Sequence, residues 1–232
     1  MCPGNKAVKV SIIIPTLNEA AIIEKTLIRA QQHNPQEIII CDGGSRDDTL
    51  AIAGKYPVRI ITVPPCRALQ MNAAAYEARG DILLFLHADS FVESTSYKKM
   101  VSVMQSSDFV GGAFSLGIES DKWPLMIISS LATWRSKYLH LTYGDQAIFV
   151  RTGIFKRING FSPLPICEDL DFFRKLRREG NTVILDEKSI TSARRWMGEG
   201  VVFTTFRNIA IALLFLLGFP PKFLNQWYLA IR

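Results

Sequence analysis

The chain has 232 residues, of which 48% are hydrophobic and 21% are charged. This composition is that of a folded protein with a sizeable core, and it excludes an intrinsically disordered chain. The formal net charge of +6 suits an anionic substrate or surface. The Lys and Arg residues are scattered rather than gathered into a tail, so nucleic acid is not expected as a partner.

Short apolar segments alternate with helical segments in the first half of the chain. Strands are predicted at residues 8–14, 37–41, 58–63 and 82–86, and helices from a cap at Asn18 to about His33, at 49–56 and at 68–78. This alternation indicates βαβ units, and strands that are apolar throughout indicate a parallel sheet covered on both faces. Polar residues follow three of the strands, at 15–19, 42–45 and 87–89. Because ligands bind at the carboxyl ends of such strands, these loops predict a single cleft.

The second half is less regular. Strands are expected at 109–116, 146–151 and 182–185, and helices at 123–138 and 168–179. Residues 201–232 are apolar with helical composition, and they contain three basic residues and no acidic one. Their longest apolar run, 209–219, is too short to cross a bilayer, which needs roughly 20 residues. We predict an α/β domain over residues 1–200 and an apolar helical extension over 201–232.

Three placements of this extension remain open. It packs on the domain, on a second subunit of a homodimer, or on a membrane surface. The four cysteines have neither paired nor zinc-binding spacing, and the first residues do not form a signal peptide. A cytoplasmic protein is therefore expected, at the inner face of the membrane if the extension binds lipid.

Asp89 is the main candidate for a metal ligand. It follows the apolar strand 82–86, which fixes it at the edge of the cleft. Hard divalent ions such as Mg²⁺ or Mn²⁺ bind carboxylate oxygens together with phosphate oxygens. The alternative is a turn or helix-cap aspartate, and the polar groups at the other strand ends favour the metal. His87 is expected to line the same pocket without binding the metal.

Other charged residues near the cleft suit the parts of a nucleotide. Asp42, in an Asp-Gly-Gly-Ser segment, can accept hydrogen bonds from a base or ribose, although this segment is also a common turn. Glu19 can reach the same pocket, or it can serve as the first-turn acid of a helix. Arg67, with Gln70, opens the third helix and suits a diphosphate; the alternative is a solvated arginine.

Two later segments complete the set of candidates. Asp169 starts a helix, where a carboxylate stays ionised and can act as a general base on an acceptor hydroxyl. The alternative for this position is the ordinary preference for acids in a first helical turn. Arg195 and Trp196 combine a cation with a large ring, which suits a phosphate and a stacked ligand, or an interfacial cluster at the sheet edge.

Four segments in this order resemble the family 2 glycosyltransferases, which have the GT-A fold. The segments are 11–19 (Ser-Ile-Ile-Ile-Pro-Thr-Leu-Asn-Glu), 42–45 (Asp-Gly-Gly-Ser), 83–89 (Leu-Leu-Phe-Leu-His-Ala-Asp) and 168–169 (Glu-Asp). Arg67 with residues 70–72, residues 143–146 and residues 192–196 further resemble a bacterial subgroup associated with arsenosugar biosynthesis. The resemblance implies a Rossmann-like α/β fold with a mixed, mainly parallel sheet flanked by helices.

The resemblance also implies roles for single residues. Pro15 and Glu19 are expected to border the nucleotide pocket, with Asp42 near the base. Asp89 matches the last Asp of the Asp-x-Asp metal motif. Asp169 matches the acidic residue that serves as base in inverting members.

Two departures from the family pattern matter. His87 stands where the first Asp of the metal motif is expected, so a single carboxylate is predicted to hold the metal. Arg195 and Trp196 resemble the end of the Gln-x-x-Arg-Trp motif of processive members, but Ser192 replaces the Gln. The multi-span membrane region of those members is also missing. Transfer of a single sugar is therefore expected rather than polymerisation.

The expected activity is metal-dependent, inverting transfer of one sugar from a nucleotide-diphosphate sugar of UDP type. The acceptor hydroxyl belongs to a small molecule or a lipid-linked molecule. One alternative, a nucleotidyltransferase, would carry a Gly-rich segment with a basic residue after the first strand, where this chain has residues 15–19. The other alternative is a non-catalytic sugar-nucleotide binding module, and the presence of both Asp89 and Asp169 argues against it.

Overall fold

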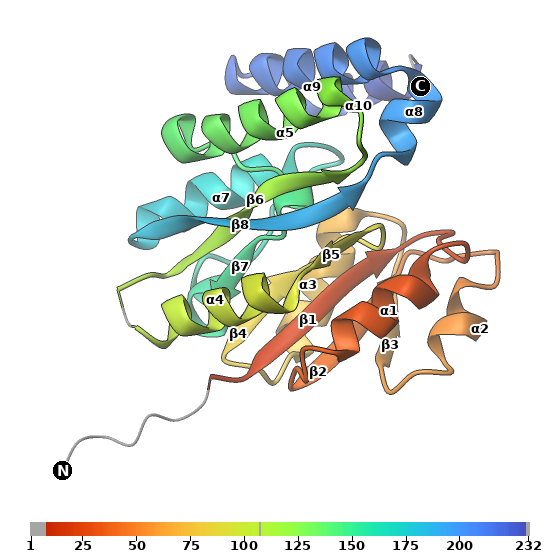
Figure 1. The fold of residues 1–232 in the computed structure, drawn as a ribbon, viewed down its shortest axis with the longest axis vertical. Helices are drawn as coiled ribbons and strands as arrows, with labels where there is room; N and C mark the ends of the chain where they lie inside the picture. Colours follow the sequence, from red (N-terminus) through yellow and green to blue (C-terminus); the bar gives the residue numbers. More distant parts are fainter. Residues whose placement is uncertain (1–7, 107, 231–232) are drawn as a thin grey trace.

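The structure, a computed structural model, describes residues 8–106 and 108–230 (Figure 1). The strands are β1 (Val10–Thr16), β2 (Glu37–Asp42), β3 (Arg59–Thr62), β4 (Ile82–Phe85), β5 (Ser90–Val92), β6 (Gly111–Glu119), β7 (Phe149–Arg151) and β8 (Thr182–Ser192). The helices are α1 (Ile23–Gln31), α2 (Thr49–Ala53), α3 (Arg67–Glu77), α4 (Ser94–Gln105), α5 (Trp123–Trp134), α6 (Thr152–Arg157), α7 (Glu168–Glu179), α8 (Arg194–Glu199), α9 (Val201–Leu216) and α10 (Pro221–Ala230). A π-helical turn η1 (Arg135–Leu139) extends α5, and a 3₁₀ turn η2 (Gly144–Gln146) precedes β7.

The eight strands form one sheet in the order β3-β2-β1-β4-β7-β6-β8-β5. β1 pairs in parallel with β2 and β4, and β2 pairs in parallel with β3. β7 runs antiparallel to both β4 and β6, and β8 is parallel to β6 but antiparallel to β5. In this register Ile13 lies between Ile39 and Phe85. The predicted mixed, Rossmann-like sheet flanked by helices is confirmed.

Helices cover both faces of the sheet, which explains why its central strands are apolar throughout. Successive side chains of a strand point to opposite faces. Ile12 and Ile14 pack in a cluster with Ile23 and Leu27 of α1 and with residues of α4. Ile13 packs in a second cluster with residues of α3, α6 and α7. The two clusters form the core that holds the strand ends in place.

Several segments differ from the sequence-based expectation, and α6 and α8 are among the elements that were not predicted. β5 and α4 occupy residues 90–105, where no element was predicted, because α4 is rich in Ser and Lys and shows only a narrow buried stripe. β8 continues to Ser192 through the charged residues 186–188, which lie at its exposed middle. Asn18 does not cap α1: it has a left-handed backbone (φ 55°) and its side chain accepts a hydrogen bond from Arg46 N, so that α1 begins at Ile23.

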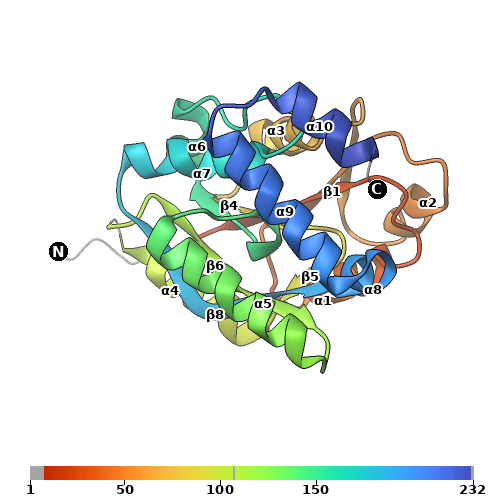
Figure 2. The same cartoon turned by 90° about the horizontal axis from the view of Figure 1, so that it is seen from above.

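The C-terminal helices lie against the domain. α5, α9 and α10 gather at one end of the molecule (Figure 1), and the view from above shows α9 crossing in front of the sheet (Figure 2). Ile211 and Ala212 of α9 pack with Leu170 of α7 and with Cys167. Within the described residues, none of the helices has the length and apolar character needed to cross a bilayer. Whether residues 201–232 form a separate unit stays a prediction.

Candidate functional site

A cavity of about 560 Å³ opens at the carboxyl ends of β1 and β4. Its walls come from the loops after these strands, from the start of α3, from η2, and from α7, α8, α9 and α10. The predicted site residues that line it are Pro15, Glu19, Arg67, Gln70, His87, Asp89, Asp169, Arg195 and Trp196. The sheet therefore brings together every predicted site residue except Asp42.

The start of α3 supplies a fixed cation and a structural amide. Arg67 Nη1 lies 3.2 Å from Glu168 Oε1, and Glu168 is almost fully buried. Burial raises the pKa of the Glu168 carboxyl, and the Arg67 guanidinium opposes that shift. Gln70 Nε2 donates to the carbonyl oxygens of Thr16 and Cys41, both at 2.8 Å, and so ties the ends of β1 and β2 together. Arg67 is thus held at the cavity by a pair with α7, while Gln70 shapes the wall.

Asp89 also lines the cavity, next to Glu19. Arg194 Nη2 bridges the two carboxylates, 3.4 Å from Glu19 and 3.8 Å from Asp89. Burial raises the pKa of Glu19, against the lowering effect of Arg194. Arg194 does not line the cavity and was not singled out for this role from the sequence. Its position explains how two acidic side chains stay close together without a ligand.

His87, Gly144 and Asp169 lie in contact at the floor of the cavity. Gly144 N donates to Asp169 Oδ2 at 2.6 Å, and Leu170 N donates to Asp169 Oδ1 at 2.8 Å. A Cβ on Gly144 would lie 2.6 Å from His87 Nε2, so any larger residue would require the His87 ring or the turn to shift. Burial lowers the pKa of His87 to about 3, and the charges of Arg67 and Arg195 add to the shift. His87 is therefore neutral at physiological pH, and Asp169 is fixed by two backbone N–H groups.

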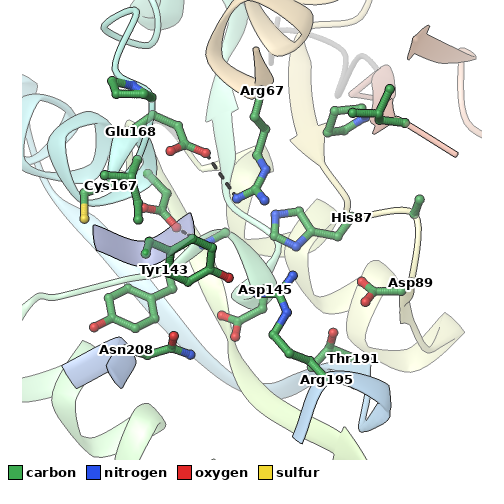
Figure 3. Close-up of a pocket in the computed structure, with 18 of the residues that line it drawn as sticks. Arg67, His87, Asp89, Tyr143, Asp145, Cys167, Glu168, Thr191, Arg195 and Asn208 are labelled. Carbon is green, nitrogen blue, oxygen red and sulfur yellow. Dashed lines mark hydrogen bonds and ion pairs between the residues drawn. The ribbon is translucent and has the colours of Figure 1, made fainter. Parts of the chain in front are cut away.

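Asp145 is the functional candidate that the sequence analysis did not identify. Its side chain projects into the centre of the pocket, between Tyr143 and Arg195 (Figure 3). Its Oδ1 atom is buried and has no hydrogen-bond partner among the described residues. Burial raises the pKa of Asp145 to about 6, with Arg135 opposing the shift. The signal in the sequence was the segment 143–146, which contributed to the subgroup resemblance but was given no chemical role.

Arg195 and Trp196 of α8 both line the cavity. The Arg195 side chain extends from below towards His87 (Figure 3). Trp196 is buried against Leu125 of α5, and its Nε1 has no partner among the described residues. Arg195 thus lines the cavity, and Trp196 packs in an interfacial cluster at its wall; their contact with a phosphate and a stacked ligand stays a prediction.

Asp42 lies outside the cavity, contrary to the expectation that its side chain faces it. The residue is fully buried. Asp42 Oδ2 accepts hydrogen bonds from Gly44 N and Ser45 N at 2.7 Å, and Oδ1 accepts from Thr16 Oγ1 at 3.1 Å. The carboxylate is thus used to hold the loop after β2, which is the common turn arrangement. Its contact with a base or ribose stays a prediction.

Asp89 is the residue of the cavity that fits a divalent cation, and only together with a ligand that supplies further oxygen atoms. No group of three or more His, Cys, Asp or Glu side chains within residues 8–106 and 108–230 is arranged to hold a metal. Asp89 provides a carboxylate whose protein contacts are long, 3.4 Å to Ser90 Oγ and 3.8 Å to Arg194. Mg²⁺ in particular is commonly held by one or two carboxylates and completed by substrate phosphates and water. The site therefore fits a cation that binds together with a phosphorylated ligand.

Comparisons with known proteins identify the family. A sequence model described as glycosyl transferase family 2 matches residues 11–159. A PGL/p-HBAD biosynthesis glycosyltransferase from Mycobacterium bovis (strain BCG / Pasteur 1173P2) is 31% identical over 165 residues, which cover 66% of this chain and 62% of that protein. The chain thus spans somewhat less than two thirds of the length of this relative.

Solved structures of low sequence identity share the fold. TarS from S. aureus superposes with a TM-score of 0.65 at 20% identity, over 89% of this chain and 65% of that one. Glucosyl-3-phosphoglycerate synthase from Mycobacterium tuberculosis, in complex with Mn²⁺, UDP and glucosyl-3-phosphoglycerate, gives a TM-score of 0.64 at 18% identity, over 95% and 87%. With a GT-A-like sheet and a family match over residues 11–159, this chain belongs to glycosyl transferase family 2.

Proposed function

We propose that the protein transfers one sugar, with inversion, from a nucleotide-diphosphate sugar of UDP type to a hydroxyl of a small or lipid-linked acceptor. The observation that carries this proposal is the convergence of Arg67, Arg195, Asp89 and Asp169 on one cavity at the carboxyl ends of the strands. Two related structures support the donor class, since TarS was crystallised with UDP-GlcNAc and the M. tuberculosis synthase with UDP. The family match favours transfer over the nucleotidyltransferase and binding-module alternatives.

Asp169 acts as the general base in this proposal. Two backbone N–H groups orient its carboxylate and leave further lone pairs free for an acceptor hydroxyl. As the acceptor oxygen attacks the anomeric carbon, its proton passes to Asp169. The bond between that carbon and the diphosphate oxygen breaks, and the nucleoside diphosphate leaves with the electron pair. A general base of this kind contributes roughly 10²–10⁴-fold to the rate.

Arg67 and Arg195 stabilise the leaving group. The two guanidinium groups reach the cavity from different elements, α3 and α8, and flank His87 (Figure 3). A bound Mg²⁺ or Mn²⁺ would neutralise charge on the diphosphate, and Asp89 is the residue that would hold it. Neutral His87 contributes hydrogen bonding without adding a charge, because its pKa is lowered to about 3.

The acceptor is placed, in this proposal, in the part of the cavity lined by Asp145 and Asn208. Arg67 with residues 70–72, residues 143–146 and residues 192–196 resemble the subgroup associated with arsenosugar biosynthesis, which supports an acceptor of that pathway type. Asn208 of α9 and Asp145 both line the cavity, and both can bind hydroxyl groups. These side chains belong to the half of the cavity opposite Arg67, where we place the acceptor.

Hydrolysis of the donor tests the proposal without knowledge of the acceptor. We expect slow, Mn²⁺-dependent release of sugar from at least one UDP-sugar, with GDP-mannose as the comparison donor, and NMR should show the sugar released first with inverted anomeric configuration. An initial product of retained configuration would refute the inverting step. Release of free phosphate or pyrophosphate instead of sugar would refute glycosyl transfer.

A further inference from the structure

α5 has its large apolar residues on the outside. Its exposed stripe consists of Trp123, Ile127, Leu131 and Trp134, at the spacing of one helix face. Trp123 is 71% exposed and Leu131 is 60% exposed. The opposite side of the helix buries Leu125 together with the small residues Ser129 and Ala132. In an ordinary surface helix the large apolar side chains face the core.

α9 shows the same inversion more strongly. Its exposed stripe consists of Val202, Phe206, Ile209, Leu213 and Leu216, which recur every three or four residues. Val202 is 82% exposed and Phe206 is 74% exposed. The buried side of α9 carries Thr204 and Arg207, and Arg207 pairs with Glu199. The helix thus turns a charged residue inwards and several of its large apolar residues outwards, although Ile211 and Ala212 are buried.

The two stripes belong to one end of the molecule. α5 and α9 contact each other, and both lie in front of the sheet when the molecule is seen from above (Figure 2). We call the two stripes together the outer apolar face. Monomeric proteins rarely expose apolar patches larger than a few hundred Å², and larger patches mark binding surfaces.

We propose that the outer apolar face docks on an anionic lipid bilayer and inserts into its interfacial region. Residues 122–144 and 200–232 contain no Asp or Glu, so neither helix carries a charge that anionic lipid would repel. Lys122 and Lys222 are exposed where α5 and α10 begin. Trp123 and Trp134 mark the two ends of α5, and Trp is enriched at membrane–water interfaces. Apolar side chains on a surface helix bury into the boundary between headgroups and acyl chains, and nearby basic residues add attraction to anionic lipid.

The docking surface and the cavity share α9. Asn208, Ile211 and Ala212 line the cavity, whereas Phe206 and Ile209 belong to the outer apolar face. A bilayer against α9 would therefore lie one helix diameter from the cavity. This arrangement favours an acceptor whose hydroxyl is held at the membrane surface. That assignment rests on the proposed function, whereas the docking on the bilayer does not depend on it.

Flotation of the full chain with vesicles tests the docking. We expect the protein to float with phosphatidylcholine vesicles that contain phosphatidylglycerol, and less with phosphatidylcholine alone, with loss at high salt. Leu131→Asp and Phe206→Asp should each weaken binding by about tenfold or more, since burying such a side chain contributes more than one factor of ten. Ile28→Asp is the matched control, because Ile28 is exposed on α1 and should not affect flotation.

Three outcomes would overturn the proposal. They are absence of flotation at low salt, unchanged flotation of both face variants, and a stable dimer in solution that dissociates in the same variants without any vesicle binding. Circular dichroism will check that the variants are folded. We expect them to be, because Leu131 and Phe206 are both exposed. Donor hydrolysis measured on the same variants separates the two proposals: hydrolysis without flotation contradicts only the docking, and flotation without hydrolysis contradicts only the proposed function.

Discussion

The two walls of the cavity are built differently. The first wall comes from β1, α3 and the loop after β4, and its polar groups are paired within the protein: Gln70 with two carbonyl oxygens, Glu19 with Arg194. The second wall comes from η2, α8 and α9, and it leaves Asp145 Oδ1 and Trp196 Nε1 buried without partners among the residues that the structure describes. Unpaired buried polar atoms are costly. The comparison indicates that the first wall is preorganised, whereas the second wall is completed by a ligand.

Asp169→Asn should have the largest effect, and it acts where α7 meets η2 of the second wall. Loss of the general base is expected to reduce transfer by roughly 10²–10⁴-fold while nucleotide binding persists. Transfer rates and nucleotide titrations on the same preparation measure the two quantities. Asp171→Asn is the control, because Asp171 lies on the same helix but its Oδ2 accepts from Ser162 Oγ. Normal transfer by Asp169→Asn would show that another residue is the base, and Asp145 would be the next candidate.

A pair of leucine substitutions tests whether α1 turns its apolar side chains to the core while α5 turns them to the outside. Leu27 of α1 is fully buried, whereas Leu131 of α5 is 60% exposed. Leu27→Ala should lower the free energy of unfolding by about 2–5 kcal/mol. Leu131→Ala should change it by no more than about 0.5 kcal/mol. Equal losses in urea titration would mean that α5 packs its apolar stripe against protein in solution.

Asp145→Asn should stabilise the free protein in a pH-dependent way. Because burial raises the pKa of Asp145 to about 6, the folded state favours the protonated carboxyl. That preference stabilises the fold below about pH 4, where the unfolded chain is also protonated, and is lost as the pH rises through about 6. At pH 8 the variant should therefore be more stable by about 2–3 kcal/mol, a gain that shrinks towards pH 4.

The control for this prediction is Asp121→Asn, since Asp121 is exposed just before α5. Thermal unfolding at several pH values measures the difference. A stability gain that does not depend on pH would contradict the charged state assigned to the second wall. Reduced donor hydrolysis in Asp145→Asn would further show that the unpaired carboxylate serves ligand binding at the expense of stability.

The first wall was largely predictable from the sequence because its elements alternate regularly. The apolar periodicity of 23, 27 and 30 identified the buried face of α1, and the polar residues after β1 and β4 identified the cleft. The orientation of Asp42 was not predictable. The same Asp-Gly-Gly-Ser segment can direct its carboxylate to a ligand or to its own loop, and hydrogen bonds with Ser45 and Thr16 decide for the loop.

The second wall could be predicted only in part. Asp169, Arg195 and Trp196 were identified by their types and neighbours, but Asp145 lies in a short turn without periodicity. The pattern of residues 123–138 predicted a helix but not which of its sides is exposed. Hydropathy identifies an apolar face, but it does not show whether that face packs on the protein core or lies on the outside. Ser129, Thr204 and Arg207 on the buried sides were the available signal.

Thermal unfolding with UDP, with and without Mn²⁺, tests most directly the claim that Asp89 holds a cation together with the nucleotide. A ligand that binds only the folded state raises the stability by RT ln(1 + [L]/Kd). We predict that UDP raises the melting temperature only when Mn²⁺ is present, and that Asp89→Asn removes this rise while its melting temperature without ligand is unchanged. An equal rise without metal, or a metal-dependent rise that persists in Asp89→Asn, would contradict the account.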